Sequence, residues 1–205
     1  MVRTKSTMLP LGTILPFFEL PIIHGTPLSD FYSKDLQRLS SNMLPQKPLL
    51  LMVICAHCPF VKHIESEITK LEQDFGNSIQ MIAFSSNSLV THPQDEPDNL
   101  AKQASLWGWR FPYLFDLDQS LAKDLMAACT PDFFLFSPSS KGKQELKYRG
   151  QLDESTPGNE LPVTGKDLRR AINKVLQLEI LDFSQKPSIG CNIKWHPGNE
   201  PHWFG

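Results

Sequence analysis

The feature that most constrains this chain is a change of period within residues 49–75, where two cysteines separate two kinds of apolar pattern. Residues 49–55 form a continuous apolar run after a proline, which is typical of a strand buried on both faces of a sheet. From residue 59 the apolar positions lie three or four apart, which predicts an amphipathic helix. They are Val61, Ile64, Ile68, Leu71 and Phe75, and Gly76 follows as a helix stop. The segment is therefore predicted to be a buried strand and then a helix, with Cys55 ending the strand and Cys58 starting the helix.

The rest of the chain continues this alternation of apolar runs and amphipathic segments. Strands are predicted over 47–55, 78–87, 110–116, 132–138 and 144–150, and helices over 59–75, 98–106, 119–129 and 164–180. The composition of 139–143 predicts a hairpin turn between the last two strands, and Thr164 is the expected N-cap of the last helix. Residues 29–43 have weak helical or loop character. Glu65 and Glu67 are expected on the charged outer face of the first helix.

This order predicts an α/β fold with a central mixed β-sheet flanked by helices on both faces. Because no internal repeat or low-complexity linker interrupts the chain, one domain is expected over residues 1–205. Residues 1–27 are proline-rich and should form an N-terminal extension with one short strand, and 183–205 an irregular C-terminal tail. This tail carries Trp195 and Trp203, which favour burial. We therefore expect it to fold back onto the domain or onto a second subunit, so a homodimer is one of the expected forms.

Charge and composition exclude several function classes. The formal net charge of −2 and the scattered basic residues give no electrostatic reason to expect a nucleic acid as partner. The longest apolar run is far shorter than the roughly 20 residues of a membrane span. Pro10 and Pro16 interrupt the N-terminal apolar residues, so neither a membrane association nor a signal peptide is expected. A cytoplasmic location is expected instead, and in that reducing compartment the four cysteines favour redox or metal chemistry over structural disulfides.

The first two cysteines are spaced for dithiol chemistry. Unpaired backbone N–H groups and the helix dipole stabilise a thiolate at a helix N-terminus, where a cysteine pKa falls from about 8.5 to roughly 3.5–7.5. Pro59 suits the first helical turn because its missing N–H has no partner to lose there. The spacing of Cys55 and Cys58 allows one sulfur to resolve a mixed disulfide formed by the other, and His57 between them can add a donor or a charge. The pair is therefore predicted to carry out dithiol–disulfide exchange.

The Cys-Ala-His-Cys motif, together with Thr130-Pro131 before a predicted strand, resembles the thioredoxin fold. Further segments, in the expected order, are similar to the peroxiredoxin-like branch of that superfamily, the AhpC/TSA-like redoxins. They are LPFFELP, CAHCPFVKHIE, FPYLFD, AACTPDFFLF, YRGQLD and PSIGCNIKWHPGNEP, and they span most of the chain. The resemblance implies that the bond before Pro131 is cis and that this proline lies against the dithiol and shapes the substrate groove. It also implies that Cys55 is the exposed, attacking thiolate, that His57 tunes it, and that Cys58 resolves the mixed disulfide.

Two departures from the family patterns bear on the reaction. The residue before the first cysteine is not the tryptophan of thioredoxins, and Ala56-His57 replaces their Gly-Pro. Aligning the reactive cysteine of peroxiredoxins with Cys58 places Cys55 at their peroxide-orienting threonine and Leu51 at their proline. Because both supporting residues are replaced, and one of them by a thiol, the resemblance favours disulfide chemistry over efficient peroxide reduction.

Four residues are candidate accessory groups. Thr130 adjoins Pro131, and Cys129 precedes it, so both are expected near the dithiol. Cys129 is either a small buried apolar residue or a third thiol that pairs with Cys55 or helps to bind a soft metal such as Cu(I). Cys191 in the tail is either a resolving thiol or a structural residue. Arg149, in the last predicted strand, is either a cation that steers an anionic or peroxide substrate or an ordinary edge-strand charge.

The sequence therefore predicts a thiol-disulfide oxidoreductase without a cofactor, with a protein or small-molecule disulfide or peroxide as substrate and a dithiol or glutathione as electron donor. A thiol peroxidase that uses the same cysteines is the nearest alternative. Another alternative is a Cu- or Zn-binding module built on Cys55 and Cys58, with or without Cys129 and a histidine. No second Cys-x-x-Cys or Cys/His pair has ligand spacing, so no metal site is predicted. A non-catalytic scaffold that binds partners through its tail is the third alternative.

Overall fold

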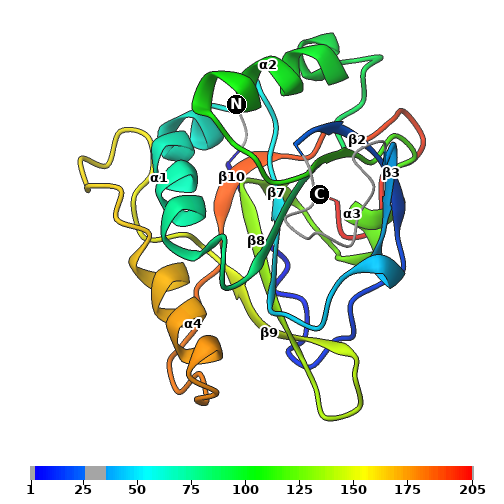
Figure 1. Cartoon of the computed structure of the whole chain (residues 1–205). Coiled ribbons are helices and arrows are strands. Elements are labelled where there is room, and N and C mark those ends of the chain that lie inside the picture. Colours follow the sequence, from blue (N-terminus) through cyan, green and yellow to red (C-terminus); the bar gives the residue numbers. More distant parts are fainter. Residues whose placement is uncertain (1–2, 26–35, 205) are drawn as a thin grey trace.

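The computed structural model describes residues 3–25 and 36–204, and its centre is a seven-stranded sheet (Figure 1). The strands lie in the order β3-β2-β6-β5-β4-β8-β9. They are β2 (Glu19–His24), β3 (Arg38–Ser40), β4 (Leu49–Val53), β5 (Gln80–Ser85), β6 (Tyr113–Phe115), β8 (Asp132–Pro138) and β9 (Gln144–Gly150). β4, β5 and β6 are parallel, whereas β2, β3, β8 and β9 add antiparallel pairs, so the sheet is mixed as predicted. Every residue of β4 is fully buried, as its continuous apolar run predicts.

Helices cover both faces of this sheet, which confirms the predicted thioredoxin-like α/β architecture. They are α1 (Pro59–Phe75), α2 (Pro97–Trp107), α3 (Ser120–Asp124) and α4 (Lys166–Leu176), with the 3-10 turns η1 (Ser41–Met43) and η2 (Pro93–Asp95). The buried side chains of α1, α2 and α4 join one apolar cluster, and those of α3 join another. The two clusters lie on opposite faces of the sheet, so α3 covers the face that α1 and α4 do not (Figure 1).

A second, three-stranded sheet joins both ends of the chain to its centre. β10 (Ile189–Asn192) lies between β1 (Arg3–Lys5) and β7 (Cys129–Thr130) and is antiparallel to both. The prediction of an irregular tail over 183–205 is therefore wrong for residues 189–192. This strand is short and its burial does not alternate, so no two-residue period marks it in the sequence. Its pairing with β1 and β7 stabilises it instead.

The prediction that the tail folds back, made from its tryptophans, agrees with the position of Trp195. Trp195 is only 5% exposed and packs in the apolar cluster on the α3 face, so the tail folds back onto its own domain. Residues 26–35 lie outside the described part of the chain. The predicted weak helix or loop over 29–43 is therefore described only from residue 36, where β3 and η1 form.

Several local predictions differ from the structure. The helix predicted over 119–129 ends at Asp124, and Cys129 lies in the strand β7. The N-terminal segment contains two strands, β1 and β2, instead of one.

Gly165, not Thr164, is the N-cap of α4. The Asp153 carboxylate accepts hydrogen bonds from the backbone amides of both residues, each at 2.6 Å, and so fixes the chain before the helix starts. Glu65 and Glu67 are buried instead of exposed.

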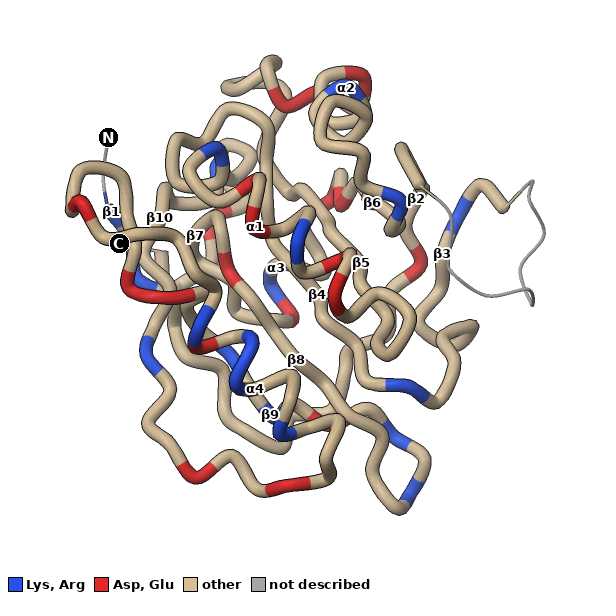
Figure 2. The backbone as a smooth tube through the Cα atoms, turned by 60° about the vertical axis from the view of Figure 1, so that its left-hand side comes forward, with Lys and Arg blue, Asp and Glu red and all other residues tan. Residues whose placement is uncertain are grey.

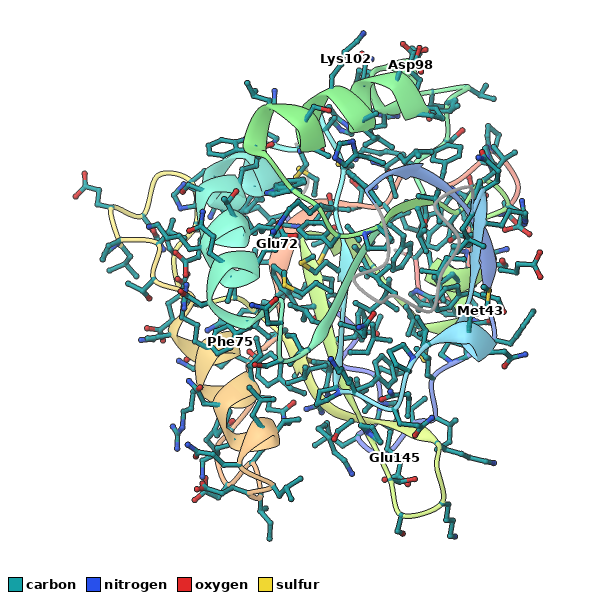
Figure 3. All side chains as sticks on the ribbon, in the orientation of Figure 1. Met43, Glu72, Phe75, Asp98, Lys102 and Glu145 are labelled. Carbon is teal, nitrogen blue, oxygen red and sulfur yellow. The ribbon has the colours of Figure 1, made fainter. Side chains whose placement is uncertain are left out.

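The burial of Glu67 has a structural reason, because this side chain joins α1 to α4. Arg169 of α4 donates from Nε to Glu67 Oε1 at 2.7 Å and from Nη1 to Asp74 Oδ2 at 2.6 Å. Its guanidinium also lies 5.7 Å from the ring centre of Phe75, at the end of α1 that faces α4 (Figure 3). These contacts fix the orientation of the helix that begins beside the cysteines.

Acidic and basic residues are interspersed over the rest of the molecule (Figure 2), in line with the net charge of −2. No helix in the described ranges combines the length and the apolar character needed to cross a lipid bilayer.

Candidate active site

The two cysteines of the Cys-x-x-Cys motif lie at the junction of β4 and α1, as predicted. Cys58 is the N-cap of α1, and Pro59 is the first helical residue. The thiols of Cys55 and Cys58 influence each other's pKa, and neither residue has exposed surface. The expectation of an exposed Cys55 is therefore wrong. Its thiol packs against Thr130, and its carbonyl oxygen accepts a hydrogen bond from the buried Gln103 at 3.3 Å.

Thr130 contacts both thiols from the neighbouring strand. Its backbone oxygen accepts a hydrogen bond from Cys58 Sγ at 3.2 Å, and its Oγ1 lies 3.5 Å from Cys55 Sγ. The Thr130–Pro131 peptide bond is cis, as the resemblance implies. β8 pairs with β4 directly after this bond, and that pairing brings the proline turn beside the thiols.

Asp95, in η2, holds the turn between the two cysteines. Its Oδ1 accepts hydrogen bonds from the backbone amides of Ala56 and His57 at 3.0 and 3.1 Å. Its Oδ2 lies 2.5 Å from His57 Nδ1 and accepts a hydrogen bond from Asn87 Nδ2 at 2.7 Å. The Asp95 side chain is fully buried, whereas 20% of the His57 side chain is exposed. His57 Nδ1 is also 3.8 Å from Cys55 Sγ, so the carboxylate orients the imidazole beside a thiol.

Hydrogen bonds and burial separate the pKa values of the two thiols. A hydrogen bond with Cys191, one with Cys55 and the backbone amide of Val61 hold the pKa of Cys58 far below its ordinary value, despite its burial. Burial raises the pKa of Cys55 well above its usual range, and the contacts with Cys58 and the nearby charge of Asp95 raise it further. The lower pKa therefore belongs to Cys58 and not, as the resemblance implied, to Cys55.

The other two cysteines adjoin the same thiols. Cys191 of β10 stands opposite Thr130 in the strand register, and it is the largest influence on the pKa of Cys58. Cys129 is fully buried, with its Sγ 3.7 Å from the backbone oxygen of Pro131. Burial raises the pKa of Cys129 well above its usual range, and the nearby Cys58 contributes to that rise. The structure therefore brings all four cysteines of the sequence to one place.

A second buried carboxyl group, Asp132, directly follows Pro131. Its Oδ1 accepts a hydrogen bond from the backbone amide of Phe133 at 3.1 Å, and its Oδ2 has no hydrogen-bond partner within the described residues. Burial raises the pKa of Asp132 to about 8, and the nearby Ser188 moderates the rise without forming a hydrogen bond of normal geometry. At neutral pH this group is therefore mostly protonated.

Three ligand atoms at the site lie close enough together to hold one metal ion. They are Cys55 Sγ, His57 Nδ1 and a carboxylate oxygen of Asp95, all within 4.8 Å of one another. Both oxygens of Asp95 already accept hydrogen bonds, so an ion would have to displace contacts that hold the turn. The ligand set suggested by the sequence, Cys55 and Cys58 with Cys129, does not converge to that distance in the described part of the chain.

Comparison with known proteins gives the family of the chain. Residues 11–144 match the AhpC/TSA family. The chain belongs to the AhpC/TSA family. It is similar to an uncharacterized conserved protein from Geobacillus kaustophilus, with 38% identity and a TM-score of 0.85 over 96% of this chain and 98% of that one. A hypothetical protein from Sinorhizobium meliloti has 35% identity and a TM-score of 0.83, over 94% of this chain and 98% of that one. AhpC from Mycobacterium bovis shares the fold at 16% identity, with a TM-score of 0.54 over 87% of this chain and 98% of that one. No curated protein matches the chain.

In this member of the AhpC/TSA family, Arg149 lies apart from the thiols. It pairs with Phe134 across β8 and β9, and Phe134 belongs to the apolar cluster on the α3 face, opposite the cluster that holds Cys55 and Cys58. Its guanidinium donates to the backbone oxygen of Leu9 at 2.9 Å and to Gln185 Oε1 at 2.7 Å. This placement favours the structural interpretation of Arg149.

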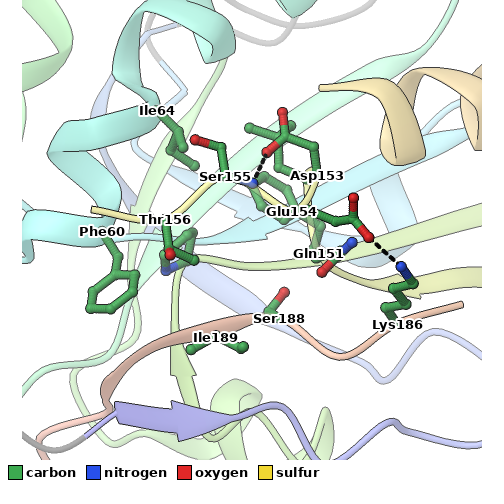
Figure 4. Close-up of a pocket in the computed structure, with 13 residues that line it drawn as sticks. Phe60, Ile64, Gln151, Asp153, Glu154, Ser155, Thr156, Lys186, Ser188 and Ile189 are labelled. Carbon is green, nitrogen blue, oxygen red and sulfur yellow. Dashed lines mark hydrogen bonds and ion pairs between the residues drawn. The ribbon is translucent and has the colours of Figure 1, made fainter. Parts of the chain in front are cut away.

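A pocket of about 230 Å³ lies beside the cis peptide bond (Figure 4). Phe60 from the first turn of α1, Pro131 and Ile189 of β10 give it apolar walls. Lys186 and Glu154 form an ion pair at one end of it (Figure 4). Pro131 therefore lines a pocket, whereas Cys55 and Cys58 are not among its lining residues, and the substrate groove at this proline stays a prediction.

The sequence analysis missed several site residues, among them Asp95 and Asn87. A positional signal could have found these two, because β4 and β5 are adjacent parallel strands. The loops that follow the carboxyl ends of such strands meet at one edge of the sheet. Cys55 follows β4, and Asp95 and Asn87 lie in the loop after β5, so their polar side chains were to be expected beside the thiols.

Proposed function

We propose that this AhpC/TSA family member is a thiol-disulfide oxidoreductase whose redox couple is Cys55 and Cys58. One observation carries the proposal: the two thiols at the start of α1 both contact Thr130, which lies beside the cis peptide bond. Dithiol–disulfide exchange needs an ionised sulfur and a second thiol within reach of it, and this pair supplies both. Membership of a redox family supports the same conclusion.

The pKa values assign the roles. Cys58, whose pKa is lowered, attacks one sulfur of a substrate disulfide and releases the other as a thiolate. Cys55 then loses its proton and attacks the Cys58 sulfur, which releases the second substrate thiolate and leaves a Cys55–Cys58 disulfide. His57, held by Asp95, places its Nδ1 3.8 Å from the Cys55 sulfur and is a polar neighbour of the thiolate in that step. An external dithiol or glutathione returns two electrons and restores both thiols.

The pocket beside Pro131 is the proposed site for the substrate group next to the attacked sulfur. Its walls from Phe60 and Ile189 favour an apolar group there, and the Lys186–Glu154 ion pair leaves no net charge at its end. Both sulfurs are buried, so a bulky substrate reaches Cys58 only when the segments around the thiols move apart.

A redox titration tests the proposal. The protein is equilibrated in buffers of reduced and oxidised glutathione, thiols are trapped by alkylation, and the mass of the peptide that carries Cys55 and Cys58 is measured. We expect one two-electron transition to a disulfide within this peptide, and that internal disulfide is absent in Cys55→Ser and in Cys58→Ser and persists in Cys129→Ala. Thiols that stay reduced, or a disulfide that does not respond to the buffer ratio, would refute the proposed function.

A thiol peroxidase is a second candidate, favoured by the complete burial of both sulfurs. A molecule as small as hydrogen peroxide needs less opening than a peptide disulfide does. The Cys58 thiolate would attack one peroxide oxygen, releasing water and forming a sulfenic acid, and Cys55 would displace a second water to form the disulfide. A peroxide consumption rate at least about a hundredfold above that of free cysteine would support this reaction, because a lowered thiol pKa alone changes the rate far less. A rate equal to that of free cysteine would exclude it.

A further inference from the structure

The strand β10 brings a third thiol to the reactive end of α1. Cys191 pairs with Thr130 in the register of β10 and β7, and the same Thr130 accepts the hydrogen bond from Cys58 through its backbone oxygen. Opposite residues of an antiparallel pair have α-carbons about 4.5–5.5 Å apart. Cys191 and Cys58 therefore meet at one residue, and the largest influence on the pKa of each thiol is the other thiol.

The backbone of β10 is held unusually close to this point. A β-carbon added to Gly190 would lie 2.0 Å from the backbone oxygen of Thr130, so only glycine permits the approach. On one side of the strand, Ser188 and Ser6 exchange hydrogen bonds of 3.0 Å. These contacts fix Cys191 in place.

On its other side the strand is tied to the active-site turn. Asn87 Oδ1 accepts a hydrogen bond from the backbone amide of Lys194 at 2.9 Å, and Asn87 Nδ2 donates to Asp95. The same side chain therefore connects the segment after Cys191 with the carboxylate that holds His57. β10 belongs to the same hydrogen-bonded unit as the dithiol turn.

We propose that Cys191 is a third redox-active thiol and that Cys58 exchanges its disulfide partner between Cys55 and Cys191. This inference rests on the proposed dithiol function. The Cys191 thiolate attacks the Cys58 sulfur of the Cys55–Cys58 disulfide, the bond to Cys55 breaks, and Cys55 leaves as a thiolate that takes up the proton lost by Cys191. One disulfide is exchanged for another, so no oxidant or reductant is consumed. The product joins α1 covalently to β10.

A Cys55→Ser variant tests the exchange directly, because Cys58 then has lost its neighbour in the motif. The folded, reduced variant is treated with diamide, which takes up two hydrogens per disulfide formed, and is then alkylated, digested without reduction and mapped by mass. Cys58 and Cys191 lie on different tryptic peptides, so their disulfide gives a cross-linked mass. We expect this species to dominate in Cys55→Ser, to persist in Cys55→Ser/Cys129→Ala, and to fall at least about tenfold in Cys55→Ser/Cys191→Ser. Cross-linking of Cys58 to Cys129 instead, or no cross-link, would overturn the proposal.

Gly190→Ala provides a second measurement in the otherwise native chain. The added methyl group must push β10 away from Thr130, so the Cys58–Cys191 cross-link should fall about tenfold relative to the wild type while the Cys55–Cys58 disulfide still forms. An undiminished cross-link would contradict the geometric basis of the exchange.

Different outcomes refute the third redox-active thiol and the proposed dithiol function. A Cys55–Cys58 couple that titrates without any Cys191 cross-link refutes only the third thiol, whereas the absence of both disulfides refutes the proposed function.

Discussion

Two buried carboxyl groups flank the thiols, and their surroundings give them opposite properties. Asp95, on the side of the cysteine turn, accepts hydrogen bonds from two backbone amides, an imidazole and a carboxamide. Burial would raise the pKa of Asp95, but the hydrogen bonds from His57 and Asn87 outweigh it, and the pKa is lowered. Asp132, on the side of the cis peptide bond, has one backbone donor, and burial raises its pKa to about 8. Burial alone therefore does not set the charge of these groups; the number of donors does.

This difference bears on which thiol ionises. The charged Asp95 adds to the effect of burial in raising the pKa of Cys55, so the thiol nearest to it stays protonated. Cys58 instead receives hydrogen bonds from Cys191 and Cys55 and faces the first turn of α1, which lowers its pKa. The sequence places both cysteines near the helix start. The Asp95 carboxylate and Cys191 of β10 determine which of the two thiols ionises.

The largest expected effect is the loss of Asp95. In Asp95→Ala two backbone amides and the Asn87 carboxamide lose their acceptor inside the protein, which should lower the free energy of unfolding by on the order of 4 kcal/mol. Urea denaturation at neutral pH measures this change. Asp95→Asn keeps one acceptor oxygen, so its free energy of unfolding should fall by less. Asp98→Ala, at an exposed carboxylate three residues further on, should lose under about 1 kcal/mol through the helix dipole. Equal losses in Asp95→Ala and Asp98→Ala would show that the hydrogen bonds of Asp95 do not hold the turn.

The protonation of Asp132 should make the free energy of unfolding depend on pH. Its folded pKa of about 8 lies above the unfolded value of about 3.9, so between them the unfolded chain has lost a proton that the folded chain keeps. Stability from this group therefore falls as the pH rises, by up to about 1.4 kcal/mol per pH unit. Between about pH 6 and pH 8 the wild type should lose on the order of 2 kcal/mol more than Asp132→Asn, as measured by urea denaturation at each pH. Parallel pH profiles of the two proteins would mean that Asp132 is charged in the folded state.

The two sides of the site also differ in how far the sequence predicts them. β4, α1 and the positions of Cys55 and Cys58 follow from a local change of period, which residues within one segment determine. The cis bond before Pro131 follows from the resemblance. Asp95 lies in a loop without any period, so its role depends on a contact between segments far apart in the chain.

The remaining differences have the same physical origin. β10 is too short to show a pattern, and its pairing with β1 near the N-terminus and with β7 in the middle of the chain creates it. The pKa order of the thiols depends on Cys191, which reaches Cys58 only through that strand. The sequence predicts that Glu67 faces solvent, but Glu67 is buried. Its ion pair with Arg169 joins two helices that the sequence cannot place side by side.

Asn87→Ala should have a smaller effect than the loss of Asp95, because the carboxylate keeps three of its four donors. The variant loses one hydrogen bond to Asp95 and one from the backbone amide of Lys194, so stability should fall by roughly 1–2 kcal/mol. Hydrogen exchange of the Lys194 amide should become faster, which urea denaturation alone would not reveal. Unchanged protection of that amide would show that Asn87 does not tie the tail strand to the turn.

Cys129→Ala should have the smallest effect, and it isolates the Asp132 side of the site. Burial, Asp132 and Cys58 raise the pKa of Cys129, and its sulfur contacts the backbone oxygen of Pro131 at 3.7 Å, so we expect it to take no part in the exchange. Removing one buried sulfur should cost about 1 kcal/mol of stability. The glutathione ratio at the midpoint of the Cys55–Cys58 transition should change by less than about twofold, since no charge is lost. A tenfold shift of that midpoint, or a disulfide to Cys129 in the oxidised wild type, would make the cis-peptide side a participant in the redox reaction and remove the contrast between the two carboxyl groups.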